Sequence, residues 1–230
     1  METKIIAHRG AWKEFDLPEN SIASFRKAIE LRCFGVELDV HLSKDGIVVV
    51  HHDHDFYGLD IENSNFGDLL SKEYSNGEKI AALKEFFEIG STVSVKLFVE
   101  IKTSNCGRTK TLVDAVCELL SVNNFAVEIA FILFDYEAAL YLNDKAKNYE
   151  IHYLNGDKTA EEIKMVGLSG MDYNYQLLID DDRVVKSFRK MRLKTNSWTV
   201  NDWEIAQKLM KQKIDFLTTD YPKLFLNKMV

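Results

Sequence analysis

The sequence predicts an α/β fold, a TIM-type (β/α)8 barrel. Short β-branched runs alternate with longer amphipathic runs almost to the C-terminus, and this alternation is typical of a parallel sheet with right-handed crossovers. A chain of 230 residues fits one such barrel, which takes roughly 200–250 residues. Its two prolines, Pro18 and Pro222, interrupt no expected element. We therefore expect one barrel domain spanning residues 1–230.

The first repeating unit illustrates the pattern. Residues 5–7 form a short apolar run, and Ile22, Phe25 and Ile29 then recur at helical spacing, with Asn20 or Ser21 available as the helix cap. Beyond residue 80 the expected strands cover 96–102, 129–134, 151–154, 170–173, 193–200 and 216–218, and the expected helices cover 83–89, 109–122, 136–147, 159–165, 180–191 and 202–211. Eight parallel strands are within reach.

The second strand is expected at residues 36–42 and is followed by a turn signal, Lys44-Asp45-Gly46. The apolar run at residues 47–50 then leads to His51-His52, so this segment has the pattern of a hairpin. The polar stretch at residues 54–79 lacks clear periodicity. We interpret it as a small insertion after the His52-Asp53 strand, lying above the barrel, where function often resides.

Acidic side chains gather on two strands. Period-two alternation places Glu37 and Asp39 on one face of their strand, opposite the apolar face that helices cover, and places Glu100 on the corresponding face of the strand at 96–102. Buried carboxylates are costly unless they are paired or bound to a metal. We therefore expect these three residues to share one divalent cation, Mg²⁺ or Ca²⁺. The alternative is a metal-free network with Arg9 and Lys102.

Two histidines converge on these carboxylates. His8-Arg9-Gly10 directly follows the first strand, where the C-terminal rim of a barrel lies, and the hairpin would return His52 to the side of Glu37 and Asp39. We predict that His8 and His52 form an acid/base pair. We expect His41, His51, His54 and His152 to be packing or surface groups, and a zinc cluster at residues 51–55 is disfavoured because Phe56 stands where its pattern needs a histidine.

Composition excludes several function classes. Apolar residues make up 46% and charged residues 28%, which favours a packed globular core over disorder. A net charge of −7 argues against a general nucleic-acid-binding surface. The odd number of cysteines, the lack of a signal peptide core before His8 and the lack of an 18-residue apolar run predict a cytoplasmic protein without a membrane span. No pattern indicates an oligomeric state.

A set of ordered motifs resembles the glycerophosphodiester phosphodiesterase family of bacteria, in its short cytoplasmic form. The motifs are His8-Arg9-Gly10, Pro18-Glu19-Asn20-Ser21, Glu37-Leu38-Asp39-Val40, Lys44-Asp45-Gly46, His52-Asp53, Glu100-Ile101-Lys102, Trp198-Thr199-Val200-Asn201 and Thr219-Asp220-Tyr221-Pro222. Their order and spacing match throughout, and they span essentially the whole chain.

This resemblance implies a TIM-type barrel that hydrolyses small glycerophosphodiesters to glycerol 3-phosphate and an alcohol. It implies a metal at Glu37, Asp39 and Glu100 and catalytic roles for His8 and His52. We expect Arg9, Lys102 and the metal to bind the phosphate oxygens. Trp198 is expected either to form an apolar wall of the substrate pocket or to pack in the barrel core. We expect Asn20 to cap the first helix as a structural residue.

The sequence departs from the family pattern in a few places. After His52-Asp53 it reads His54-Asp55-Phe56-Tyr57-Gly58 rather than Leu-x-Arg-Thr-Thr with a glycine-rich insertion, which leaves substrate preference open. Residues 133–135 and 171–174 are also only loosely similar. The alternatives are a phospholipase D-like or phospholipase C-like enzyme of the same superfamily acting on lipids, and a non-catalytic barrel that binds phosphorylated ligands.

Overall fold

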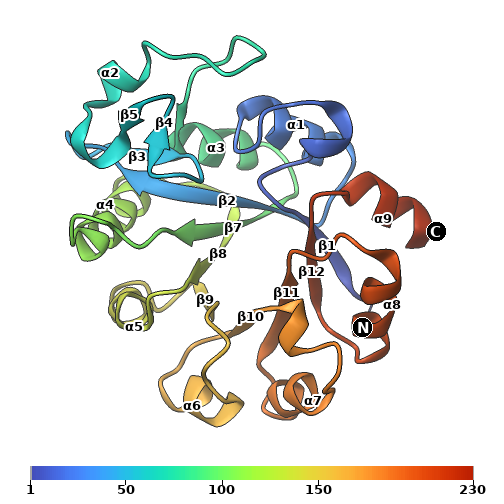
Figure 1. Ribbon diagram of the computed structural model, residues 1–230. Helices are drawn as coiled ribbons and strands as arrows, with labels where there is room; N and C mark the ends of the chain where they lie inside the picture. Colours follow the sequence, from blue (N-terminus) through green and yellow to red (C-terminus); the bar gives the residue numbers. More distant parts are fainter. Residues whose placement is uncertain (1, 230) are drawn as a thin grey trace.

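The computed structural model describes residues 2–229, and within them eight parallel strands follow one continuous path (Figure 1). The path runs β12-β1-β2-β7-β8-β9-β10-β11, so neighbours along the chain are neighbours in the sheet. The bounds are β1 (Lys4–Ala7), β2 (Gly35–Leu42), β7 (Lys96–Ile101), β8 (Glu128–Leu133), β9 (Glu150–Tyr153), β10 (Gly170–Asn174), β11 (Lys194–Trp198) and β12 (Phe216–Thr219). The predicted α/β architecture is confirmed.

The two strands at the ends of this path lie side by side, which brings the sheet around into a barrel (Figure 1). They are joined by individual hydrogen bonds rather than by a regular ladder. The Asp215 N–H donates to the Thr195 carbonyl at 3.1 Å, and the Val200 N–H donates to the Thr218 carbonyl at 2.9 Å. The chain leaves the strand geometry after Trp198, two residues before the predicted end. Because the strand ends there, Val200 can lie beside β12 and form this hydrogen bond.

A helix follows each barrel strand and lies on the outside of the sheet (Figure 1). The helices are α1 (Ile22–Glu30), α3 (Leu83–Gly90), α4 (Thr109–Val122), α5 (Tyr136–Lys145), α6 (Ala160–Met165), α7 (Arg183–Lys190), α8 (Trp203–Lys211) and α9 (Pro222–Met229). The last of these has no counterpart among the sequence-based predictions. In residues 2–229, no helix combines the length and the apolar run that a membrane span requires.

Strand alternation divides the apolar residues into two packed regions. Val36, Leu38 and Val40 of β2 are fully buried and belong to the large cluster between sheet and helices. A separate cluster fills the barrel interior, and it consists of Ile6, Phe98, Ala130, Ile132, Leu154 and Phe216. Side chains on the interior face therefore change from apolar at the bottom to charged at the carboxyl ends of β2 and β7.

The predicted hairpin after β2 is confirmed. β3 (Val48–Val50) pairs antiparallel with β2, with Val40 opposite Val50 and Leu42 opposite Val48. The His51 N–H continues the pairing by donating to the Asp39 carbonyl at 3.0 Å. This register returns His52 to the carboxyl end of β2, beside the acidic residues.

The insertion that follows is more ordered than its weak periodicity indicated. It contains β4 (Asp55–Phe56) and β5 (Leu59–Asp60), the short helices η2 (Ile61–Asn63) and α2 (Phe66–Leu69), and β6 (Ala81–Ala82), which returns the chain to β3. It has a small core of its own, formed by Val49, Phe56, Ile61, Leu69, Tyr74 and Ile80. This packing fixes the loop that carries His52.

The start of α1 corrects one prediction. Ser21 is the N-cap, and its hydroxyl accepts a hydrogen bond from the Ser24 N–H. Asn20 does not cap the helix, because its backbone is left-handed, with φ of 54°, and its side chain instead contacts Asp39. Asparagine tolerates this conformation better than most residues. The local pattern of polar residues did not reveal this long-range contact.

The close approach of β10 and β11 generates a stability prediction. A Cβ atom on Gly170 would lie 2.8 Å from the Lys194 carbonyl carbon, whereas one on Gly67 in α2 would meet nothing within 4 Å. We expect Gly170→Ala to lower the free energy of unfolding by about 1–3 kcal/mol through overpacking, and Gly67→Ala to leave it unchanged or raise it. Urea denaturation of both variants measures this, and equal midpoints for the two would contradict it.

Candidate active site

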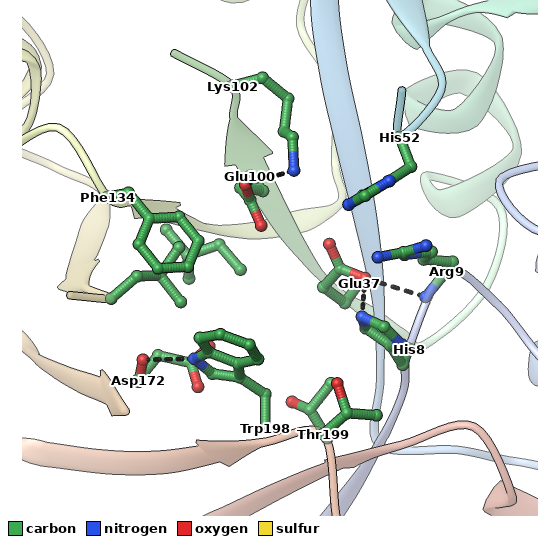
Figure 2. Close-up of a pocket in the computed structure, with 13 residues that line it drawn as sticks. His8, Arg9, Glu37, His52, Glu100, Lys102, Phe134, Asp172, Trp198 and Thr199 are labelled. Carbon is green, nitrogen blue, oxygen red and sulfur yellow. Dashed lines mark hydrogen bonds and ion pairs between the residues drawn. The ribbon is translucent and has the colours of Figure 1, made fainter. Parts of the chain in front are cut away.

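A cavity of about 230 Å³ opens among the side chains at the carboxyl ends of the barrel strands (Figure 2). One part of its lining is charged and comes mainly from β1, β2, β7 and the β3 hairpin, and another part is apolar. Its lining residues are His8, Arg9, Glu37, His52, Glu100, Lys102, Ile132, Phe134, Leu154, Asp172, Trp198, Thr199 and Thr218. This end of the barrel is where TIM-barrel enzymes carry their active sites.

The three predicted carboxylates converge. Glu37 and Asp39 project from β2, and Glu100 projects from β7, where it is the register partner of Asp39. Each offers an oxygen within 4.8 Å of the others. Glu37 is 3% exposed and Asp39 is 1% exposed, so their charges are almost fully removed from water. Parallel pairing of β2 with β7 therefore creates the cluster that alternation predicted.

The electrostatics of these carboxylates are unequal. Burial and the neighbouring Asp39 raise the pKa of Glu100 to about 7, and burial together with Asp39 and Glu100 raises the pKa of Glu37 well above its usual range. Burial acts in the same direction on Asp39, but Lys102 and Arg9 outweigh it and lower the pKa of Asp39 to about 2. The chain therefore neutralises Asp39 well and leaves Glu37 and Glu100 short of positive charge.

The two predicted cations are partly engaged by the cluster. The Lys102 Nζ lies 3.2 Å from Asp39 Oδ1 and 2.8 Å from Glu100 Oε1, and the Arg9 Nε lies 3.3 Å from Asp39 Oδ2. The Arg9 Nη1 also donates to both oxygens of Glu19, at 2.9 and 3.0 Å. These contacts fix both side chains along the edge of the cavity. Part of the predicted salt-bridge network is thus present.

The remaining carboxylate favours a metal site over a salt-bridge network. Glu37 Oε2 accepts a hydrogen bond from the Arg9 backbone N–H at 2.9 Å, but the buried Glu37 Oε1 has no hydrogen-bond partner among the described residues. If this buried carboxylate is ionised, it needs a cation beside Oε1, and the described residues place none there. The donors are all oxygen atoms, the set that Mg²⁺ and Ca²⁺ prefer. The residues therefore fit a hard divalent cation.

His8 is held by a residue from the other end of the chain. Its Nδ1 lies 2.7 Å from Asp220 Oδ1, and the carboxylate accepts this hydrogen bond from the ring. Asp220 Oδ2 accepts further hydrogen bonds from Asn201 Nδ2 at 2.8 Å and from Lys13 Nζ at 3.3 Å. The opposite ring nitrogen of His8, Nε2, lies 3.9 Å from Glu37 Oε2. Asp220 thus fixes the tautomer that leaves Nε2 facing the cavity.

His52 has a similar arrangement on the opposite side of Glu37 (Figure 2). Its Nδ1 donates to Asp53 Oδ1 at 2.7 Å, which leaves Nε2 available. The His52 carbonyl accepts a hydrogen bond from the His41 Nε2 at 3.0 Å. The partners differ in environment, because the side chain of Asp53 is 72% exposed and that of Asp220 is 10% exposed. His41, placed among packing residues by sequence, therefore supports the His52 backbone.

The other predicted packing histidines lie outside the cavity lining. His152 is fully buried and its ring contacts Phe98 and Phe216. His51 packs edge-on against Phe56 in the insertion core. The ring of His54 meets that of His41.

The apolar wall is formed by two aromatic residues, one directly after β8 and one at the end of β11. Trp198 lies on the cavity wall, and its Nε1–H donates to the Asp172 carbonyl at 2.9 Å, which fixes the plane of the indole. The Phe134 ring meets it edge to face, with centroids 5.5 Å apart. Figure 2 shows both rings across the cavity from Glu37 and His52. Trp198 thus lines the cavity and also packs against the apolar cluster of the barrel interior.

Sequence reasoning missed or misassigned several residues at this site. Glu19 and Asn20 support Arg9 and Asp39 rather than only shaping the start of α1. Asp220 received no defined role, although its motif ends a strand at the same rim. Phe134 and Asp172 lie in the two regions that match the family motifs poorly. Position at the carboxyl end of a barrel strand was the signal that could have found Asp172 and Asp220.

Comparisons with known proteins agree with this architecture. Residues 8–224 match the model of the glycerophosphoryl diester phosphodiesterase family. A glycerophosphodiester phosphodiesterase of Caldanaerobacter subterraneus subsp. tengcongensis is 28% identical, over 99% of this chain and 98% of its own. Two crystal structures of glycerophosphodiester phosphodiesterases are also similar. That from Parabacteroides distasonis is 30% identical with a TM-score of 0.93 and covers 99% of this chain and 96% of its own. That from Thermotoga maritima is 31% identical with a TM-score of 0.79 and covers 99% of each chain.

The fold and the converging carboxylates, histidines and cations define a (β/α)8-barrel phosphodiesterase. The chain belongs to the glycerophosphoryl diester phosphodiesterase family. The resemblance read from the ordered motifs is therefore confirmed over essentially the whole chain.

The His8–Asp220 pair predicts a pH dependence of stability. Burial opposes ionisation of Asp220, but the hydrogen bond and charge of His8 outweigh it and lower the Asp220 pKa to about 2 from 3.8. Because the folded pKa is depressed, ionised Asp220 stabilises the fold above pH of about 4, and this contribution is lost as the pH falls toward 2. We expect Asp220→Asn to lose roughly 2 kcal/mol at pH 6 and about half as much at pH 3.

Urea unfolding of the wild type and of Asp220→Asn at several pH values between 3 and 6 measures this difference. The exposed Asp16, which has φ of 53°, provides the control Asp16→Asn. A stability difference for Asp220→Asn that stays constant across this range would contradict the assigned ion pair.

Proposed function

We propose that the protein is a metal-dependent phosphodiesterase that hydrolyses small glycerophosphodiesters to glycerol 3-phosphate and an alcohol, with His8 and His52 as the acid/base pair. One observation carries this proposal. Two histidines, each held at Nδ1 by a carboxylate, flank Glu37, whose Oε1 has no hydrogen-bond partner among the described residues, at the mouth of a barrel whose family hydrolyses this class of ester.

The charged part of the cavity suits a phosphodiester anion. Arg9 and Lys102 line it and are held in place by Glu19, Asp39 and Glu100. We assign both cations to the phosphate oxygens, where fixed positive charge stabilises the charge that develops in the transition state. Glu37, Asp39 and Glu100 would hold a divalent cation, which would supply further positive charge for the phosphate and polarise the phosphorus–oxygen bonds.

The histidines supply the proton transfers. One Nε2 accepts a proton from the nucleophile, and the other donates a proton to the alcohol oxygen as its bond to phosphorus breaks. General acid–base catalysis of this kind contributes ~10²–10⁴-fold for each group. The nucleophile is either water or the 2-hydroxyl of the glycerol, which would give a cyclic phosphate first. Asp220 and Asp53 act as positioning residues by fixing the tautomers.

The size and lining of the cavity favour a small substrate over a diacyl lipid. The enclosed volume of about 230 Å³ lies below the ≈ 300–1,000 Å³ range of drug-sized ligand sites. Trp198 and Phe134 offer the wall against which the carbon face of a glycerol group packs. We therefore propose deacylated glycerophosphodiesters as the substrates. We also propose that the protein acts in the cytoplasm.

Substitution of the histidines tests the catalytic assignment. We expect His8→Ala and His52→Ala each to lower kcat for glycerophosphocholine by at least ~10²-fold, because each removes one proton transfer. The assay measures release of glycerol 3-phosphate from this substrate and from glycerophosphoethanolamine. The control is His51→Ala, which changes a neighbouring histidine outside the cavity lining. Full turnover by either of the first two variants would overturn the pair. Activity on diacyl lipids alone would favour the lipid-hydrolysing alternative.

Metal removal tests the carboxylate assignment. We expect EDTA to abolish activity and Mg²⁺ or Ca²⁺ to restore it. The added cation should also raise the Tm of the wild type, because it binds the folded state, and should not raise that of Glu37→Gln or Glu100→Gln. Full activity in EDTA, with no divalent ion in the purified protein by elemental analysis, would instead support the metal-free salt-bridge network.

A further inference from the structure

The cavity contains a carboxyl group that neither the proposed metal site nor the histidine pair uses. Asp172 lies on β10, is 1% exposed and lines the cavity on the side of the aromatic wall. Its Oδ1 has no hydrogen-bond partner among the described residues. Strand alternation explains the direction of this side chain, since Met171 and Tyr173 belong to the outer cluster and residue 172 must face the barrel interior.

The surroundings of Asp172 do not account for a carboxyl group there. Ile132, Leu154 and Trp198 line the same part of the cavity. Burial and the negative charge of Glu100 raise the pKa of Asp172 well above its usual range, against an opposing effect of the neighbouring Asn196 side chain. The Trp198 indole is bound by the Asp172 backbone carbonyl and not by its side chain. A leucine at this position would fold at lower free-energy cost, so the carboxyl group points to a ligand.

The polar side chains of Asn196 and Thr218 near Asp172 are already engaged. Asn196, the register partner of Asp172 on β11, donates to Thr218 Oγ1 at 3.0 Å and accepts from the Ser197 N–H at 2.8 Å. Thr218 Oγ1 in turn donates to Asn196 Oδ1 at 3.4 Å. These bonds satisfy Asn196 and Thr218 within the barrel. Asp172 therefore lines the cavity with a buried Oδ1 that no described residue pairs.

We propose that Asp172 is a specificity-determining residue that hydrogen-bonds a hydroxyl of the glycerol group and selects glycerol esters from other phosphate esters. This inference rests on the proposed function and names the recognition element for its substrate. With the phosphate between Arg9 and Lys102, the glycerol carbons extend toward Trp198 and Phe134, and Asp172 is the carboxyl group on that side. The aromatic wall contacts the carbon face of the glycerol group. A ligand without a hydroxyl would leave the buried carboxyl group unpaired and would therefore bind more weakly.

Paired ligands that differ in their hydroxyl groups test this assignment. The probes are sn-glycerol 3-phosphate and propyl phosphate, which lacks both hydroxyls, titrated by calorimetry into the full chain with Mg²⁺ or Ca²⁺. We expect the wild type to bind glycerol 3-phosphate at least ~10-fold more tightly, the lower range for a ligand hydroxyl paired with a buried group. Asp172→Leu should reduce this ratio to about 1–3, mainly by weakening glycerol 3-phosphate binding. Asp172→Asn, which keeps hydrogen-bonding atoms, should retain part of it.

Further measurements separate recognition from a structural role. We expect Asp172→Leu to have an unchanged or higher Tm, since it removes a buried unpaired group, whereas loss of a structural residue would lower Tm. Asp16→Asn, a change of an exposed carboxyl group outside the cavity lining, should leave the ligand ratio unchanged. An unchanged ratio in Asp172→Leu, or a wild type that does not distinguish the two ligands, overturns the inference.

Hydrolysis assays keep this inference distinct from the proposed function. If the wild type binds glycerol 3-phosphate through Asp172 but hydrolyses no glycerophosphodiester, the proposed function fails and the hydroxyl recognition stands. If it hydrolyses glycerophosphocholine and Asp172→Leu retains the wild-type preference over a propyl phosphodiester of choline, the recognition fails and the proposed function stands.

Discussion

The close packing of Glu37, Asp39 and Glu100 at the mouth of the barrel is the constraint on which the rest of the site depends. Three carboxylate oxygens lie within 4.8 Å of one another with little water access, so each nearby cation has a defined place. Lys102 lies between Asp39 and Glu100, and Arg9 lies between Asp39 and Glu19. These contacts do not fully compensate the repulsion among the three carboxylates, and Glu37 experiences most of what remains. The same residue lies next to His8.

Support for the side chains of this cavity comes from segments far apart in the chain. Asp220 reaches His8 across 212 positions, and Asn20 donates to Asp39 across 19. These partners meet because β1 pairs with both β2 and β12, so the loops after all three strands share one rim. Pairing of β1 with β12 and with β2 therefore brings Asp220 to His8 and Asn20 to Asp39. A shift in the register of β12 would move Asp220 away from the histidine it orients.

The insertion between β2 and α3 combines structural and functional constraints. Its small apolar core holds β3 and β6 together and thereby fixes the turn that presents His52. His41, on β2, binds the His52 carbonyl and connects this insertion to the barrel wall. The two histidines are thus held differently. His8 is held by a buried residue at the barrel rim, whereas His52 lies on the partly exposed insertion. This difference gives the two rings unequal solvation.

Much of the fold and of the charged half of the site was determined by the sequence itself. Alternation along β2 and β7 placed Glu37, Asp39 and Glu100 on the inner face, and the Lys44-Asp45-Gly46 turn returned His52, because strand periodicity and turn chemistry are local properties. The tertiary structure decided the rest. The partnership of Asp220 with His8, the contact of Asn20 with Asp39 and the unpaired carboxyl group of Asp172 depend on which strands become neighbours when the barrel closes. Local sequence patterns do not predict these contacts, because barrel closure brings together residues that are far apart along the chain.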